Sequence, residues 1–215
     1  MKKYKKSFKN DTPRTRTRIY FIGGINGVGK SKLLDLLAQQ NQDFEIIHGS
    51  EYFMQWLGLE KGDYRSLRSL PHGVKNEELN KMMRSLTCCF STSIRPRLIS
   101  AHYLGIDEGK ITCATGNWIS LFDALFFINA KPEEILERIN RDFLETQRNR
   151  PIFPVGPLSK KTKLMLLSRY LKKSLEEVKK LSVRSKVPYF VIQNKTGTLQ
   201  QTVDDLINRI KLIEK

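Results

Sequence analysis

The sequence predicts an α/β domain in which a parallel sheet of about five strands has helices on both faces. Three observations support this class. Short β-rich runs alternate with segments whose apolar residues recur every three or four positions, which is the order expected of β–α–β units. A glycine-rich loop at 24–31 joins the first of these strands to the first helix. The run ALFFIN at 124–129 is almost wholly apolar, as is typical of a strand covered on both faces.

In the first half of the chain, strands and helices are predicted in alternation. β-rich composition predicts three strands, at 18–22, 44–47 and 97–101. Helical spacing of apolar residues predicts three helices, at 31–40, 51–59 and 76–94. The last of these should end before Pro96, because the residue that precedes a proline is disfavoured in a helix. Residues 110–115 fit either one arm of a hairpin or a loop.

The second half continues the pattern after the apolar strand. A helix should start at Pro132 and run through Phe143, because proline suits the first helical turn and the two acids that follow it face the positive end of the dipole. The basic segment 160–184 predicts a long amphipathic helix with its lysines on the solvated face. The closing strand and helix are expected at 188–193 and 199–213. Helical crossovers between parallel strands then imply three layers.

Composition describes a globular, basic chain. Its 215 residues are 40% hydrophobic and 28% charged, and a chain of this size can bury roughly 70% of its unfolded surface without disulfides or a structural metal. Three cysteines, two of them adjacent, form no disulfide framework, which suits the reducing cytoplasm where we expect the protein. No apolar run approaches the ~20 residues that span a bilayer, so we expect no membrane partner.

Residues 1–17 are predicted to be a disordered basic tail, and residues 18–215 the folded domain. The first eighteen residues carry eight Lys/Arg and one acid, without apolar periodicity. No hydrophobic segment follows them, so they do not read as a secretory signal. A solvated extension is the main interpretation, and a transit peptide or contact with RNA is an alternative. The net charge of +16 would favour a polyphosphate ligand but assigns no partner by itself.

The strongest functional signal is the segment GINGVGKS, which fits the pattern GxxxxGK[ST] in full. A phosphate needs several backbone N–H groups converging on it, and glycines allow the tight loop that aims them. Lys30 would reach the β and γ phosphates and the Ser31 hydroxyl would ligate Mg²⁺, which predicts ATP and Mg²⁺ as cofactors. The nucleotide-binding candidates are Gly24, Ile25, Asn26, Gly27, Val28, Gly29, Lys30 and Ser31. The expected class is therefore the three-layer P-loop NTPase fold.

Around and beyond this loop, the chain resembles the archaeal-type adenylate kinases of the nucleoside monophosphate kinase family. The resemblance rests on the order and spacing of GGINGVGKS, FEIIHGSEYFMQWLG, DYRSLRSLP, RLISAHYLG, ALFFINAKPEEILERI, QRNRP and PYFVIQNKTG. It implies helical insertions that bind the acceptor, at about 49–95, and form a lid, at about 138–158. It also implies transfer of the γ-phosphoryl of Mg·ATP to a nucleoside monophosphate, with AMP as the first candidate, by a monomer or small homo-oligomer.

The resemblance also implies roles for individual residues. A phosphoryl transferase must hold two clusters of negative charge together, so arginines should approach from several segments. Arg68 matches the arginine expected to grip the acceptor phosphate, and His102 matches a histidine found after the third strand. Asn194 follows the last strand, where relatives pack against adenine, although an ordinary turn fits equally well. The lid arginines, which would neutralise charge during transfer, are matched by Arg138, Arg148 and Arg150.

One departure from the archaeal-type pattern concerns magnesium. The pattern has an aspartate two residues before the histidine, where it orders Mg²⁺ through its water shell, and this chain has Ser100 there. Asp107, Glu108 or Asp123 could supply the acid from another direction. Two alternatives to a nucleoside monophosphate kinase therefore stay open. One is a kinase of another small phosphoacceptor or of a polynucleotide end, and the other is a non-catalytic ATP-binding protein whose basic tail contacts RNA.

Overall fold

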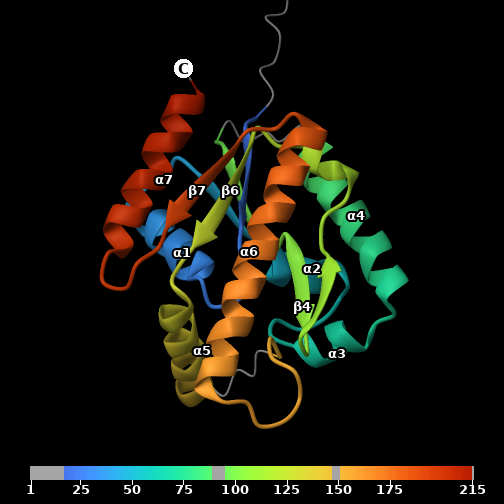
Figure 1. Ribbon diagram of the computed structural model, residues 1–215. Coiled ribbons are helices and arrows are strands. Elements are labelled where there is room, and N and C mark those ends of the chain that lie inside the picture. Colours follow the sequence, from blue (N-terminus) through green and yellow to red (C-terminus); the bar gives the residue numbers. More distant parts are fainter. Residues whose placement is uncertain (1–16, 89–94, 147–150, 215) are drawn as a thin grey trace, which may run out of the picture.

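A five-stranded parallel sheet forms the centre of the computed structural model, which describes residues 17–88, 95–146 and 151–214. The strands lie in the order β2-β3-β1-β6-β7, and each neighbouring pair is parallel (Figure 1). Their bounds are β1 Ile19–Gly23, β2 Glu45–His48, β3 Arg97–Ala101, β6 Ala124–Asn129 and β7 Tyr189–Gln193. The predicted fold class is confirmed, and each predicted strand forms within a residue or so of its expected bounds.

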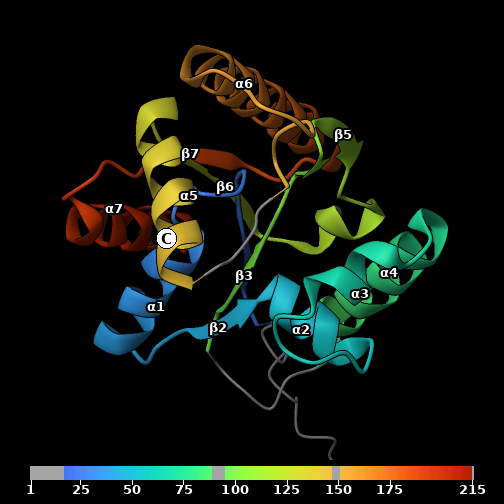
Figure 2. The same ribbon diagram turned by 90° about the horizontal axis from the view of Figure 1, so that it is seen from below.

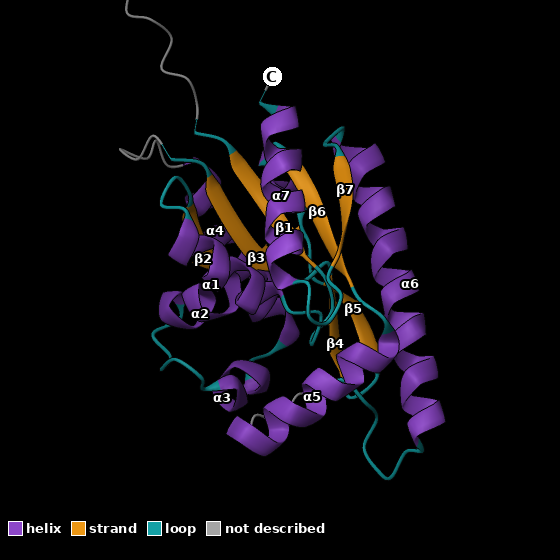
Figure 3. Ribbon diagram, turned by 90° about the vertical axis from the view of Figure 1, so that its left-hand side faces the viewer, coloured by secondary structure: helices purple, strands orange, loops and turns teal. Residues whose placement is uncertain are grey.

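Alternating side chains of the strands build two hydrophobic cores, one on each face of the sheet. Tyr20 and Ile22 of β1 pack with buried leucines of α1 (Lys30–Gln40) and with α7 (Leu199–Ile213). Ile19 and Phe21 point the other way, toward α2 (Gly49–Trp56), α4 (His72–Cys88) and the second half of α6 (Lys160–Ser185). Figure 3 shows α7 lying across one face of the orange strands. All five residues of β1 are buried because strands flank it on both sides.

Three short elements, α3, β4 and η1, were not expected from the sequence, and a fourth, β5, was one of two alternatives. A helix, α3 (Tyr64–Ser69), begins where the Asp63 side chain accepts a hydrogen bond from the Ser66 amide at 3.0 Å. Strands β4 (Leu104–Asp107) and β5 (Lys110–Cys113) form an antiparallel hairpin, which decides the interpretation of residues 110–115 in favour of a hairpin arm. A 3-10 helix, η1 (Asn117–Leu121), precedes β6. The helix expected at 76–94 begins four residues earlier, and residues 89–94 lie outside the described part.

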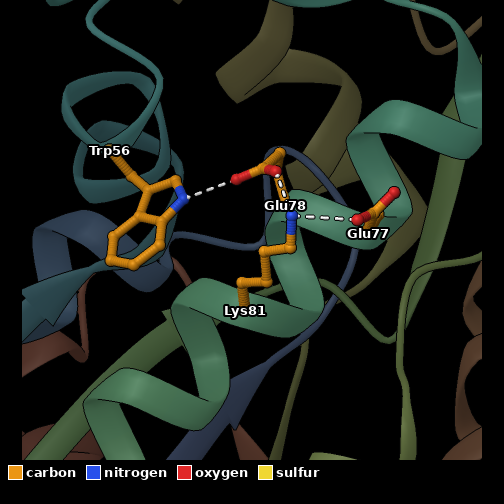
Figure 4. Close-up of polar contacts among 4 residues, drawn as sticks. All are labelled: Trp56, Glu77, Glu78 and Lys81. Atoms are coloured by element: carbon orange, nitrogen blue, oxygen red, sulfur yellow. Dashed lines mark hydrogen bonds and ion pairs between the residues drawn. The ribbon is translucent and has the colours of Figure 1, made fainter.

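Helices α2, α3 and α4 follow β2 in the chain and lie together beside the β2–β3 side of the sheet (Figure 2). The indole N–H of Trp56 on α2 donates to Glu78 of α4 at 3.0 Å. Lys81 bonds to the carboxylates of both Glu77 and Glu78 at 2.9 Å (Figure 4). These contacts join the first and last helices of the predicted acceptor-binding region. They are mostly exposed, so they align the two helices more than they stabilise them.

The predicted lid begins within α5 (Pro132–Thr146), which lies below the sheet in Figure 1, and ends just before α6. Ser159 caps α6 by accepting a hydrogen bond from the Thr162 amide at 3.1 Å. Residues 147–150 of the lid and 1–16 of the basic tail lie outside the described residues. Within residues 17–88, 95–146 and 151–214, no helix is long and apolar enough to cross a membrane.

Candidate nucleotide-binding and active site

The loop at 24–31 leaves the carboxyl end of β1 and is anchored from below by its own apolar side chains. Ile25 and Val28 are 1% and 0% exposed and belong to one of the two cores. Gly27 and Gly29 have φ values of 83° and 92°, which L side chains rarely adopt. A Cβ at Gly29 would also overlap the side-chain amide of Asn194. Glycine is therefore required where the main chain turns beneath a ligand.

The amino end of α1 directly follows this loop, with Gly29 as the N-cap. Gly29 has no side chain that could accept a hydrogen bond from the first turn. The first amides of a helix have no partner within the helix, and the helix dipole adds partial positive charge there. Ser31 is exposed in this first turn. The loop and helix together can hold the phosphates of a nucleotide, as the sequence predicts.

A cavity of about 720 Å³ opens over the loop at the carboxyl ends of β2 and β3. Its two halves differ in chemistry. One half is formed by the loop, the start of α1 and the turn after β7. The other half is apolar and comes from α2, α3, α4 and η1, with lining residues Phe53, Leu67, Leu79, Met82, Met83 and Trp118. A ligand in the apolar half would lie directly beside phosphates held by the loop.

Lys30 and His102 meet at the loop. The Lys30 ammonium donates to the carbonyl oxygens of Gly24 and Ile25 at 2.8 and 3.1 Å. The Nδ1 atom of His102 lies 2.8 Å from the same Gly24 oxygen and 3.5 Å from Lys30 Nζ. A carbonyl oxygen only accepts hydrogen bonds, so Nδ1 of His102 carries the ring proton and donates a hydrogen bond to the Gly24 oxygen. His102 therefore lines the cavity and forms a hydrogen bond with the loop at 24–31, which we call the phosphate loop.

Arg138 of α5 reaches the loop from the opposite side. Its guanidinium donates to the carbonyl oxygens of Val28 and Asn194 at 3.1 Å each and to the Thr196 hydroxyl at 3.2 Å. Burial lowers the pKa of Arg138 from its usual value, although Glu134 opposes this effect. An arginine keeps its charge at neutral pH even so. Arg138 thus brings positive charge to the cavity wall, while Arg148 and Arg150 lie outside the described residues.

Asn194 connects the turn after β7 to the phosphate loop. It is 3% exposed, and its side-chain amide donates to the Val28 carbonyl at 2.7 Å. Its main-chain N–H donates to Asn129 at the end of β6, also at 2.7 Å. Residues 194–197 line the cavity, and the contact of Asn194 with the base of a nucleotide stays a prediction. A further observed role of the Asn194 side chain is to brace the loop.

Two other predicted features lie away from the cavity. Arg68 is exposed at the end of α3, and it is Tyr64 and Leu67 of that helix that line the cavity. None of the three suggested substitutes for the missing acid lines the cavity. Asp123 accepts a hydrogen bond from the Ile19 amide at 2.7 Å, at the amino end of β1 and therefore opposite the loop. Asp107 and Glu108, the other two substitutes, are exposed on the β4–β5 hairpin.

The sequence-based reasoning missed a polar group in the cavity. Asp35 of α1 and His48 of β2 form a polar contact of 3.0 Å between Oδ1 and Nε2, and His48 Nδ1 lies 3.5 Å from Ser100 Oγ. Arg141 and Asp142 of α5 also line the cavity. One signal was available, since Asp35 follows Ser31 by four residues and so lies on the same helix face. The position of His48 depends on its strand pairing with Ser100, which the sequence does not give.

No family model matches the sequence, and no curated protein matches it. The structure is similar to solved kinases. A shikimate kinase from Acinetobacter baumannii, solved with shikimate, has a TM-score of 0.57 at 13% identity, over 91% of this chain and 93% of that one. A shikimate kinase from Bacteroides thetaiotaomicron has a TM-score of 0.56 at 13% identity, over 90% and 98% of the two chains. A thymidylate kinase from Candida albicans gives 0.52 at 13% identity, over 93% of each chain.

These similarities show the fold alone, a three-layer α/β fold that this chain shares with the shikimate and thymidylate kinases. At 13% identity they do not carry an acceptor from those proteins to this one. The finer resemblance to archaeal-type adenylate kinases remains a prediction from the sequence.

Proposed function

We propose that this protein is an ATP-dependent kinase that transfers the γ-phosphoryl group of Mg·ATP to a small acceptor. A single observation carries the proposal: the phosphate loop and an apolar ligand pocket are two halves of one cavity of about 720 Å³. Lys30 and Arg138 lie at the nucleotide half of the cavity, where they would neutralise charge during transfer. Catalysis of this kind consists of positioning and electrostatic stabilisation and needs no covalent intermediate.

The residues around the loop fit both ATP and Mg²⁺. Added side-chain bulk at Gly29 would collide with the Asn194 amide that holds the loop in place. Mg²⁺ prefers oxygen ligands, and the hydroxyl of Ser31 and the carboxylate of Asp35 lie on one face of α1 at the cavity. When bound, Mg²⁺ would neutralise phosphate charge. In the chain itself, Lys30 and the first amides of α1 would hold the phosphates, with Arg138 beside them.

The acceptor that we propose is a nucleoside monophosphate, with AMP first. The resemblance to archaeal-type adenylate kinases runs through the segments that form the second half of the cavity. The pocket itself is suited to a planar base, because aromatic and methionine side chains line it. The buried Trp118 indole N–H has no hydrogen-bond acceptor within the described residues, so it would be available to a ring nitrogen or carbonyl group of the ligand.

A non-catalytic ATP-binding protein is the second candidate. Ser100 favours it, because a neutral hydroxyl at the end of β3 gives Mg²⁺ less electrostatic support than a carboxylate would. Such a protein would bind ATP tightly and transfer nothing. The two functions can therefore be separated by one assay of phosphoryl transfer.

The experiment measures ADP formation by the full chain with AMP, CMP, UMP, GMP, dTMP, shikimate and short oligonucleotides as acceptors. We expect transfer to AMP and a fall of at least about a hundredfold in kcat for Lys30→Ala, because the lost cation stabilises the transferring phosphoryl group. Lys110→Ala, which removes an exposed charge from β5, should match the wild type. Unchanged turnover by Lys30→Ala, or ATP binding without transfer to any acceptor, would refute the kinase.

A further inference from the structure

A chain of three polar side chains crosses the cavity from α1 to the sheet. Asp35 Oδ1 lies 3.0 Å from His48 Nε2, and His48 Nδ1 lies 3.5 Å from Ser100 Oγ. A carboxylate only accepts hydrogen bonds, so Nε2 is the protonated nitrogen, and in a neutral ring Nδ1 then accepts a hydrogen bond from the Ser100 hydroxyl. All three residues line the cavity. The register of β2 against β3 makes His48 and Ser100 direct neighbours.

This chain is poorly explained as a device for stability. The side chains of Asp35 and His48 are 55% and 24% exposed, and exposed ion pairs contribute little to folding. The contact instead fixes the orientation of the Asp35 carboxylate, which lies at the cavity wall. Asp35 follows Ser31 by four residues, so the two side chains lie on the same face of α1.

The position beside Ser31 is the one where Mg²⁺ needs further negative charge. Mg²⁺ keeps several water molecules and is held through one or two carboxylates in addition to phosphate oxygens. In P-loop proteins an aspartate usually supplies this charge together with the loop Ser or Thr. Here the ends of β3 and β6 present Ser100, Ala101 and Asn129, none of which is ionised. Another element must provide the carboxylate.

Three carboxylates line the cavity among the described residues, and two of them have other surroundings. Glu51 of α2 pairs with Lys61 at 2.8 Å. Asp142 lies on α5, one residue from Arg141. Asp35 shares both the helix and the helix face of the metal-binding hydroxyl.

We propose that Asp35 holds the water shell of the Mg²⁺ in bound Mg·ATP and that His48, joined to Ser100, positions it. The inference rests on the proposed function, since it requires Mg·ATP at the loop. In this proposal Asp35 of α1 takes the role of the carboxylate that is missing at the end of β3. The imidazole of His48 links Asp35 to Ser100, the residue at the strand position. Asp35 then interacts with the metal, and His48 acts through Asp35.

The test is calorimetric titration of the full-length protein with ATP, once with Mg²⁺ and once with EDTA. The ratio of the two affinities measures what the metal contributes. We expect Asp35→Asn to reduce this ratio by about 10- to 100-fold, as loss of a carboxylate around a metal does, while the affinity in EDTA stays the same. His48→Ala should reduce the ratio by less. Adding Ser100→Asp to Asp35→Asn should restore it, because the new carboxylate would occupy the strand position.

Asp107→Asn is the matched control, since it removes an equal charge from the exposed hairpin and should leave the ratio unchanged. The proposal is overturned if Asp35→Asn keeps the wild-type ratio. It is equally overturned if the variant loses affinity to the same extent in EDTA, which would make Asp35 a structural residue. Absence of ATP binding by the wild type under both conditions is a different result, because it refutes the proposed function and this inference with it.

Discussion

Individual side chains behind the phosphate loop hold it in shape from elements far apart in the sequence. The Val28 carbonyl accepts from both Asn194 and Arg138. Glu134 in turn accepts from the main-chain amide of Thr196 at 2.7 Å. The loop is therefore preorganised by the turn after β7 and by α5 rather than by its own glycines alone. Preorganisation of this kind lowers the entropic cost of binding a ligand.

Replacing Glu134 by Gln should reduce stability at neutral pH, and this loss should fade in acid. Burial acts to raise the pKa of the Glu134 carboxyl, but hydrogen bonds from Thr196 and Lys131 and the charge of Arg138 outweigh it and lower the pKa. A depressed pKa in the folded state means that the ionised carboxylate stabilises the protein fully above its unfolded pKa of about 4.3. The contribution is lost as the pH falls through the lower, folded value.

The measurement is the urea midpoint of wild type and Glu134→Gln at intervals between pH 7 and pH 3. Glu176→Gln, which changes an exposed carboxylate in the middle of α6, is the control and should leave the urea midpoint close to that of the wild type. A difference between wild type and Glu134→Gln that stays constant across this range would show that the carboxylate charge is not the cause.

A candidate site residue could be predicted from the sequence when the residues that it acts with are close to it in the sequence. Lys30 and Ser31 were predictable, because the phosphate loop is contiguous and its chemistry is determined by eight residues in a row. The contact of Asp35 with His48 was not, because it arises only when α1 and β2 pack together. Arg138 was predicted for its charge, but its bond to the Val28 carbonyl depends on tertiary structure.

Secondary-structure elements also divide into those that the sequence predicts and those that it does not. The strands and long helices of the three layers were predictable, because each buries apolar residues in one or both of the two cores. The β4–β5 hairpin has no such face: β5 has no buried residue, and β4 buries only Leu104. Helix α3 has six residues and buries none of them fully. Short elements that are held by turns and caps leave no periodic signal in the sequence.

Strands β2 and β3 are joined to α4 by one buried arginine. Arg97 is 9% exposed, and its Nε donates to Glu45 of β2 at 2.7 Å. Its second nitrogen donates to the Leu86 carbonyl of α4 at 2.8 Å. The edge strand β2 and the helix that carries Met82 and Met83 of the pocket therefore depend on the same guanidinium.

Arg97→Ala should cost about 1–3 kcal/mol of unfolding free energy, because it leaves the buried Leu86 carbonyl without this donor. Chemical denaturation measures the loss. Arg95→Ala is the control: Arg95 is exposed and bonds to the Gln42 carbonyl, so its removal should change stability by less than about 0.5 kcal/mol. Equal effects of the two substitutions would show that the buried position of Arg97 does not matter.

In the molecule as a whole, the candidate site residues lie at one edge of the sheet. All five strands are parallel, so their carboxyl ends lie at the same edge, where α/β proteins bind ligands. The phosphate loop follows β1, His48 ends β2, His102 follows β3 and Asn194 follows β7. Helices α2, α3 and α5 lie near this edge (Figure 1). The basic tail, in contrast, joins the chain at the amino end of β1.

Deleting residues 1–16 should therefore weaken binding to RNA and leave Mg·ATP binding intact. The deletion removes seven basic residues and one acid, which lowers the net charge from +16 to +10. Each cation that contacts a single-stranded phosphate contributes about 0.7 to the slope of log affinity against log salt, so the slope should become shallower by up to about 5. ATP affinity should not change, because the deleted segment joins the sheet at the end opposite the loop. Fluorescence anisotropy with a short single-stranded RNA over a range of salt measures the slope, and an identical slope for both forms would make the tail a solvated extension without a part in RNA contact.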